Sequence, residues 1–243
     1  MTASKADIIA QLQKEILSLQ GFKTAFNNTA VDAGLGSIKN AFPNSTFPVG
    51  AIHEFISAAA EDGAATGGFV AGILSTLMKT SGATIWISAS RTIFPPALKS
   101  YGIAPDKIIF IDLKKEKEIL WAIEEALKCK GLSAVVGEMQ ELSFTTSRRL
   151  QLAVEQSQVT GFILRRNPRS LNTTACVTRW KITSLPSELA DKMPGVGFPR
   201  WNVELLKVRN GRPGAWQIEF AAGSFKHISK IAAIALEQQK KTG

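Results

Sequence analysis

The sequence predicts an α/β protein with a mostly parallel central sheet, a C-terminal antiparallel β extension and an N-terminal helical arm. Three observations predict this class. Between about residues 51 and 164, short apolar segments alternate with helical ones, which is typical of βαβ units. Between 176 and 220 the segments alternate apolar and polar residues, as antiparallel strands do. At 243 residues with 45% hydrophobic content, the chain is long enough to bury a core without disulfides.

The arm is predicted as a helix over residues 4–20. Ser4 and Asp7 have the spacing of a capping box, and Gly21 follows as a C-terminal stop. Four apolar residues recur at helical spacing and form one stripe: Ile8, Leu12, Ile16 and Leu19. This stripe is suited to docking on a partner, or to folding back on the chain's own core. The loop-like stretch 24–46, rich in Asn, Gly and Pro, sets the arm apart.

The remaining elements follow from apolar periodicity and turn residues. The expected strands are 51–57, 83–89, 107–112, 132–136 and 161–164, followed by 176–182, 202–209 and 216–220. The expected helices are 69–79, about 96–101, 116–128, 147–155 and 225–238. A glycine-rich turn is expected over 61–68, and a turn over 211–214 joins the last two strands. The corresponding divisions are an arm (1–23), a core domain (24–223) and a C-terminal basic helix or tail (224–243).

The net charge of +9 lies entirely in the second part of the chain. Residues 1–140 carry equal numbers of acidic and basic side chains, so residues 141–243 hold the whole excess. Arginine follows the same division: Arg91 is the sole arginine of the first part, and nine follow it. A one-sided basic field favours an acidic partner, either nucleic acid or an acidic protein surface, over a merely solubilising face.

Several classes of protein are excluded. The start of the chain lacks the apolar region of a signal peptide, and the longest weakly polar run, 63–78, is shorter than a membrane helix. Cys129 and Cys176 cannot make a disulfide scaffold, and two histidines are too few for a His/Cys zinc site. We therefore expect a cytoplasmic protein with no membrane partner, no metal and no cofactor.

A strand, a glycine-rich turn and a helix near the start of an α/β domain is where a phosphate-binding loop belongs. The working pattern is G-x-x-x-x-G-K-[ST], in which the lysine reaches the phosphates and the hydroxyl holds Mg²⁺. Here Asp62 stands for the first glycine, Gly68 replaces the lysine and Phe69 replaces the hydroxyl. The candidate residues of this degenerate loop are Asp62, Gly63, Thr66, Gly67 and Gly68. A tight turn of small residues is the alternative interpretation.

Three segments together resemble a RecA-like core. Residues 48–54 follow a P-x-G-x-I-x-E pattern, and the apolar segments 83–90 and 132–136 follow at a fitting spacing. The chain resembles the ImuA family of bacterial SOS-mutagenesis proteins more closely. That resemblance is carried by a TRW motif at 178–180 and by a PRW…ELL…RPGAW series over 199–216. It covers roughly residues 30 to 222.

The resemblance implies a RecA-like protein that has lost catalysis. A RecA-type ATPase places a glutamate just after the strand at 83–89 to orient the attacking water, and this position is Ser90. The metal-binding aspartate should end the strand at 132–136, whereas the first acid there, Glu138, is one position out of register. Phosphoryl transfer depends on positioning and electrostatics, so these losses together predict a non-enzyme with degenerate Walker A and B motifs.

The family resemblance also implies partners. It predicts an accessory factor in DNA-damage-induced (SOS) translesion synthesis and error-prone repair. This factor would bind RecA, an ImuB-type Y-family-like protein and an error-prone replicative-type DNA polymerase, in the cytoplasm at the nucleoid. In RecA-type filaments an N-terminal helix packs on the neighbouring protomer, which gives the arm stripe a second possible role.

The basic second half supplies candidate binding residues: Arg148, Arg149, Arg165, Arg166 and Arg169. In a RecA-like fold these segments correspond to the two DNA-facing loops. The arginines are suited to phosphates of single-stranded DNA, or to acids of this chain or of a partner. Trp180, Trp201 and Trp216 could stack on bases, but we expect them in the core of a small β-sheet.

Three rival functions stay open from the sequence. SulA shares the ATPase-dead RecA-like core, so a SulA-like inhibitor of cell division is the first. A single-stranded-DNA-binding module is the second, and a divergent ATPase that uses Glu138 is the third.

Overall fold

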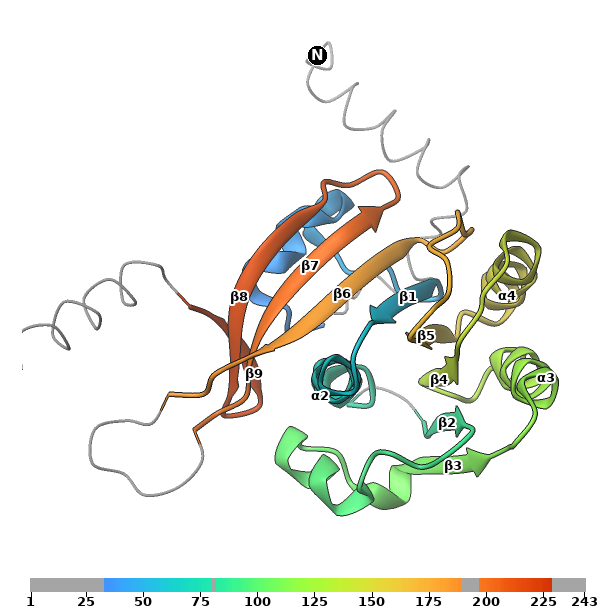
Figure 1. The fold of residues 1–243 in the computed structure, drawn as a ribbon, viewed down its shortest axis with the longest axis horizontal. Helices are drawn as coiled ribbons and strands as arrows, with labels where there is room; N and C mark the ends of the chain where they lie inside the picture. Colours follow the sequence, from blue (N-terminus) through green and yellow to red (C-terminus); the bar gives the residue numbers. More distant parts are fainter. Residues whose placement is uncertain (1–32, 80–81, 189–196, 229–243) are drawn as a thin grey trace, which may run out of the picture. The chain divides into compact units, whose positions relative to one another are not determined.

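The computed structural model describes residues 33–79, 82–188 and 197–228. They form a nine-stranded sheet in the order β3-β2-β4-β5-β1-β6-β7-β8-β9 (Figure 1). Pairing is parallel from β3 to β6 and antiparallel from β6 to β9, so the predicted α/β class, with its mostly parallel sheet and antiparallel C-terminal strands, is confirmed. The strands are β1 (Ile52–Ser57), β2 (Thr84–Ser88), β3 (Ile108–Asp112), β4 (Ala134–Met139), β5 (Thr160–Arg166), β6 (Thr178–Leu185), β7 (Arg200–Val208), β8 (Gly214–Ala221) and β9 (Ser224–His227).

Three α-helices connect the parallel strands. They are α2 (Ala60–Leu77), α3 (Glu116–Leu127) and α4 (Phe144–Ser157). The α4 helix begins three residues earlier than its apolar periodicity predicts, because the Ser143 hydroxyl accepts the backbone N–H of Thr146 and caps it. Short 3₁₀ turns complete the connections: η1 (Gly36–Ala41), η2 (Pro43–Ser45), η3 (Pro95–Tyr101) and η4 (Pro105–Lys107). No helix among the described residues is long and apolar enough to span a bilayer.

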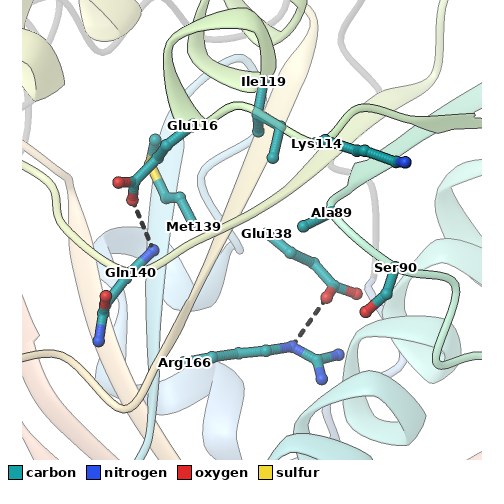
Figure 2. Close-up of a pocket in the computed structure, with 9 residues that line it drawn as sticks. All are labelled: Ala89, Ser90, Lys114, Glu116, Ile119, Glu138, Met139, Gln140 and Arg166. Carbon is teal, nitrogen blue, oxygen red and sulfur yellow. Dashed lines mark hydrogen bonds and ion pairs between the residues drawn. The ribbon is translucent and has the colours of Figure 1, made fainter.

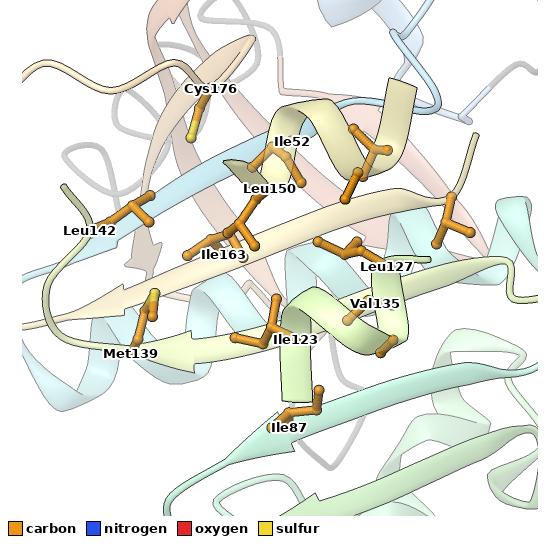
Figure 3. Close-up of a cluster of buried hydrophobic side chains, with 14 of the residues drawn as sticks. Ile52, Ile87, Ile123, Leu127, Val135, Met139, Leu142, Leu150, Ile163 and Cys176 are labelled. Carbon is orange, nitrogen blue, oxygen red and sulfur yellow. The ribbon is translucent and has the colours of Figure 1, made fainter. Parts of the chain in front are cut away.

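The two faces of the sheet are covered by chemically different cores. On one face, α3 and α4 pack on the parallel strands through aliphatic side chains (Figure 3). Members of this cluster from the strands include Ile52, Ile87, Val135 and Ile163. They alternate with residues that point to the other face, as the pleat requires.

The opposite face carries α2 and a layer of aromatic rings. Phe69 of α2 packs on Trp180 and Trp201, with ring centroids 5.7 and 6.2 Å away. Trp180 also stacks on Phe55 of β1 at 6.0 Å. Trp180 and Trp201 are buried, which confirms that these two tryptophans belong to the core of the β extension. Trp216 on β8 is only half-buried.

The predicted glycine-rich turn over 61–68 is wrong, because that whole segment lies inside α2. Only two residues separate β1 from the helix, and the Asp62 carboxylate accepts the backbone N–H of Ala59 at 3.3 Å. The glycines serve packing instead of backbone freedom. A β-carbon on Gly68 would lie 2.6 Å from the Tyr101 hydroxyl, and one on Gly72 would collide with the Phe225 ring. Small residues therefore let the aromatic layer approach the helix.

The predicted C-terminal helix over 225–238 is also wrong at its start. Ser224–His227 form β9, paired antiparallel with β8. Ala222 and Gly223 adopt positive φ angles of 53° and 73° and turn the chain back. Phe225 is buried between exposed neighbours, a period of two that favours a strand. The rest of that helix and the arm stripe (Ile8, Leu12, Ile16 and Leu19) lie outside the described residues. The domain boundaries stay predictions.

His53 on β1 is buried in a fixed hydrogen-bond chain. Its ring stacks on Phe47 with centroids 4.4 Å apart. Nε2 lies 2.8 Å from the Pro48 carbonyl oxygen, which can only accept, so Nε2 carries the proton. Nδ1 therefore accepts from the Thr178 hydroxyl at 2.8 Å, and that oxygen accepts the Trp180 indole N–H at 2.7 Å. Burial lowers the pKa of His53 to about 3, and the bond to Pro48 opposes this shift.

The free energy of unfolding is expected to fall as the pH drops below the ordinary histidine pKa of 6.5. Between pH 6.5 and pH 3 the histidine binds a proton in the unfolded chain but stays neutral in the folded protein. Its contribution to the free energy of unfolding is therefore present above pH 6.5 and is lost progressively toward pH 3. Urea unfolding at about pH 7.5 and about pH 5.5 should differ by about 1.4 kcal/mol. The difference should disappear in His53→Gln and persist in His227→Gln, since His227 is exposed. A difference that persists in His53→Gln would assign the effect to other groups.

Candidate functional site

The five predicted arginines do not form one surface. Arg165 is fully buried, and Arg166 is partly buried. Arg149 forms an ion pair with Glu124 of α3. Only Arg148 and Arg169 are exposed without a side-chain ion pair to the described residues. The predicted use of Arg165 as a contact for DNA or a partner is therefore wrong: its guanidinium lies inside the protein.

Arg165 is the centre of a buried polar cluster between β5, β1 and β6. Its Nη1 lies 2.9 Å from Glu54 Oε1, and both side chains are fully buried. The other carboxylate oxygen of Glu54 accepts from Arg179 Nε at 2.8 Å and from the Thr174 hydroxyl at 2.7 Å. Arg165 Nη2 also lies 3.2 Å from Glu141 Oε2. Each buried charge thus has an opposite charge and further hydrogen bonds, the condition under which burial is tolerated.

Arg166 points to the other face and pairs with a second buried acid. Consecutive residues of a strand face opposite sides, and Arg166 follows Arg165 on β5. Arg166 Nε lies 2.7 Å from Glu138 Oε2 (Figure 2). The Trp86 indole N–H donates to Glu138 Oε1 at 2.8 Å. Burial raises the pKa of Glu138, while Arg166 and Trp86 oppose the rise.

Glu138 and Arg166 line a cavity of about 230 Å³ at the carboxyl ends of β2, β4 and β5 (Figure 2). Ser90, Lys114 and Gln140 also line it. The neighbouring strands β2 and β4 end at this cavity. The chain continues from β2 to β3 on one side and from β4 to β5 on the other, so the cavity lies at a topological switch point of the sheet. Such points are where open α/β sheets bind ligands. Here the carboxylate at the end of β4 is already engaged by the protein's own arginine and indole.

The residues of the predicted degenerate phosphate loop have structural contacts in α2. Asp62 caps the helix at Ala59, and the Thr66 hydroxyl lies 3.0 Å from that of Ser57. A β-carbon on Gly67 would lie 3.2 Å from Ile93, and Gly68 faces Tyr101 and Trp201. Gly63 faces the Arg166 guanidinium, 3.9 Å from where a β-carbon would stand. From Gly63 onward the backbone N–H groups of these residues are used in helical hydrogen bonds, so they do not form a cradle of loop N–H groups.

Sequence reasoning missed the roles of Glu54 and Trp86 in these clusters, and it also missed those of Glu141, Thr174 and Arg179. A signal existed for Glu54, because a carboxylate within the apolar run 52–56 needs a buried partner. Nothing in the sequence pairs Trp86 with Glu138, since they are brought together by the β2–β4 register, in which Trp86 faces Val136. Within the three described stretches, no group of three or more His, Cys, Asp or Glu side chains is placed to hold a metal.

Comparisons with known proteins give two kinds of match. The chain is 35% identical over 216 residues to Protein ImuA from two strains of Caulobacter vibrioides, covering 82% of this chain and 88% of the relative. It is 29% identical over 119 residues to the cell division inhibitor SulA of Photorhabdus laumondii, covering 47% of this chain and 67% of SulA. No family model matches the chain.

Proposed function

The chain belongs to the ImuA family, and from this premise we propose that it is a non-catalytic, RecA-like accessory factor of damage-induced translesion synthesis. It acts by binding RecA, an ImuB-type Y-family-like protein and an error-prone replicative-type polymerase at the nucleoid. Single-stranded DNA is a further candidate partner.

The arrangement of the resemblance-bearing segments supports a RecA-like core. The segments at 48–54, 83–90 and 132–136 contribute β1, β2 and β4 to one parallel sheet, with β1 leading into α2. The motifs at 178–180 and 199–216 lie on β6, β7 and β8, which are hydrogen-bonded neighbours. The residues that carry the family resemblance are therefore gathered on the antiparallel extension.

The observation that carries the non-catalytic proposal is the continuous helix at the predicted phosphate loop. A triphosphate needs free N–H groups and a cation at the carboxyl end of the first strand. In this chain that position is taken by the first turn of α2, which carries the acids Glu61 and Asp62, and Gly68 supplies no cation. The acid at the end of β4 is neutralised internally by Arg166. Binding surfaces, not chemistry, are then what the scaffold provides.

Nucleotide binding and turnover by the purified full chain test this proposal. Calorimetric titration with Mg-ATP should show no heat of binding, and phosphate release should equal that of buffer. Glu138→Gln is the control variant, because a divergent ATPase that relies on this acid would lose turnover in it. Turnover by the unmodified chain that vanishes in Glu138→Gln would overturn the non-catalytic proposal.

The partial match to SulA favours one alternative, inhibition of cell division. The two functions separate in cells. We expect deletion of the gene to lower the frequency of damage-induced mutation and overexpression to leave cell length normal. Filamentous cells on overexpression, with an unchanged mutation frequency after deletion, would support the SulA-like function instead.

A further inference from the structure

Three large apolar side chains are exposed along α4 and on the connection that lies beside its start. Phe144 and Leu152 on the helix are 55% and 44% exposed, and Leu171 on the β5–β6 connection is 60% exposed. Phe144, Arg148 and Leu152 are four residues apart, so they follow one stripe of the helix surface. Exposed apolar groups gathered in this way mark interaction sites more often than scattered ones do.

The β5–β6 connection that carries Leu171 is held from inside by the buried cluster. Arg165 Nη2 donates to the Ser170 carbonyl at 2.9 Å. Arg179 Nη2 donates to the Asn172 carbonyl at 2.6 Å, and the Asn172 side chain donates to the Leu142 carbonyl at 2.9 Å. Both neighbours of Leu171 are therefore fixed, and the last of these bonds places the connection beside the start of α4. These hydrogen bonds on both sides keep the Leu171 side chain at the surface of the protein.

Two exposed arginines accompany these apolar groups, and the acid beside Arg169, Glu141, already pairs with Arg165. Arg148 lies between Phe144 and Leu152 on the stripe, and Arg169 lies two residues before Leu171. Within the described parts of the chain neither guanidinium forms an ion pair, whereas Arg149 is paired with Glu124. Two free cations beside three apolar groups complement an acidic peptide with apolar side chains. They suit a nucleic acid less well, since affinity for the phosphate backbone rises with the number of cations.

We propose that Phe144, Arg148, Leu152, Arg169 and Leu171, together the α4 surface, bind a short acidic segment of a partner protein that carries two or three large apolar side chains. The apolar side chains of the segment cover Phe144, Leu152 and Leu171. Its carboxylates pair with Arg148 and Arg169 and fix its direction. This inference rests on the proposed role as a binding factor and names the chemistry of one partner.

A random library of peptides of about 16 residues, displayed on phage and selected on the immobilised full chain, tests the surface. Enriched peptides should be net negative and contain at least two of Leu, Ile, Phe and Trp. For a synthetic copy of the most enriched peptide, Phe144→Ser with Leu171→Ser should weaken binding about tenfold or more. Arg148→Ala with Arg169→Ala should weaken it about threefold to tenfold and reduce its salt dependence.

Two exposed residues outside the surface serve as matched controls. Phe94 is 69% exposed on the β2–η3 connection, and Arg212 is exposed on the β7–β8 turn. Phe94→Ser and Arg212→Ala should leave peptide affinity unchanged. Enrichment of neutral or basic peptides, or equal binding by the Phe144/Leu171 variant, would overturn the proposal.

Binding of a labelled oligothymidylate to the same variants tests the alternative that this surface binds nucleic acid. Binding that is lost in the Arg148/Arg169 variant but kept in the Phe144/Leu171 variant would make this a DNA surface, against the proposal. We expect no such binding at physiological salt. Because the peptide assay needs neither nucleotide nor cells, its failure leaves the proposed cellular function standing, and the reverse also holds.

Discussion

Replacing Arg165 with alanine is expected to lower the free energy of unfolding by about 3–5 kcal/mol, a large part of the stability of an ordinary domain. The substitution removes the ion pairs to Glu54 and Glu141 and leaves Glu54 buried with one cation, Arg179. It also removes the donor of two hydrogen bonds, those that the guanidinium makes to the carbonyl oxygens of Gln140 and Ser170. Urea unfolding followed by circular dichroism at neutral pH measures the effect.

Two further variants separate the causes of this loss. Arg165→Lys keeps the charge but cannot reproduce the planar set of donors, so we expect an intermediate loss. Arg169→Ala removes an exposed arginine four residues later in the same basic run, and it should change the free energy of unfolding by less than about 0.5 kcal/mol. A loss below about 1 kcal/mol in Arg165→Ala would mean that the buried cluster does not hold the three strands together.

Replacing Trp180 with alanine is expected to cost about 3–5 kcal/mol, because it opens a cavity in the aromatic core. Trp180 is fully buried and contacts Phe42, Phe55 and Phe69. Its loss also removes the indole donor to Thr178, on which the position of His53 depends. Thermal and urea unfolding of the variant measure the cost.

Trp121→Ala is the matched control, since the Trp121 side chain on α3 is 66% exposed. We expect a change within about 0.5 kcal/mol for it. If the two tryptophan variants lost similar stability, the aromatic layer under α2 would not be the core of the sheet that the ring contacts describe.

Apolar periodicity was sufficient for the architecture of the parallel strands. The segment 83–89 and the face of 116–128 that carries Ile119 and Ile123 were identified, because their burial depends on local spacing alone. The glycine run of α2 was misassigned for a physical reason. Glycine is enriched both where a chain turns and where another element packs closely on it, and only the contacts to Tyr101 and Phe225 distinguish the two.

The sequence identifies the arginines of the candidate site but not the face of the sheet to which each side chain points. Arg165 and Arg166 are adjacent in a basic run, yet one enters the Glu54 cluster and the other meets Glu138. Once β5 is known to extend through Arg166, the alternation of a strand separates them. Apolar periodicity ends this strand at residue 164 and predicts the basic run as a loop, because the ends of strands are the feature that a sequence pattern defines least well. Arg148 and Arg169 keep the exposed positions that a binding role needs.

The position of β1 has a consequence for how the chain folds. Ile52 pairs with Gly161 and His53 pairs with Thr178, so both flanking strands are synthesised more than a hundred residues after this one. Until then its two hydrogen-bonding edges have no native partner, and contacts so distant in sequence form slowly. A ribosome-bound chain that stops short of β5 would therefore expose an apolar, aggregation-prone segment, which makes the nascent polypeptide a natural client for chaperones.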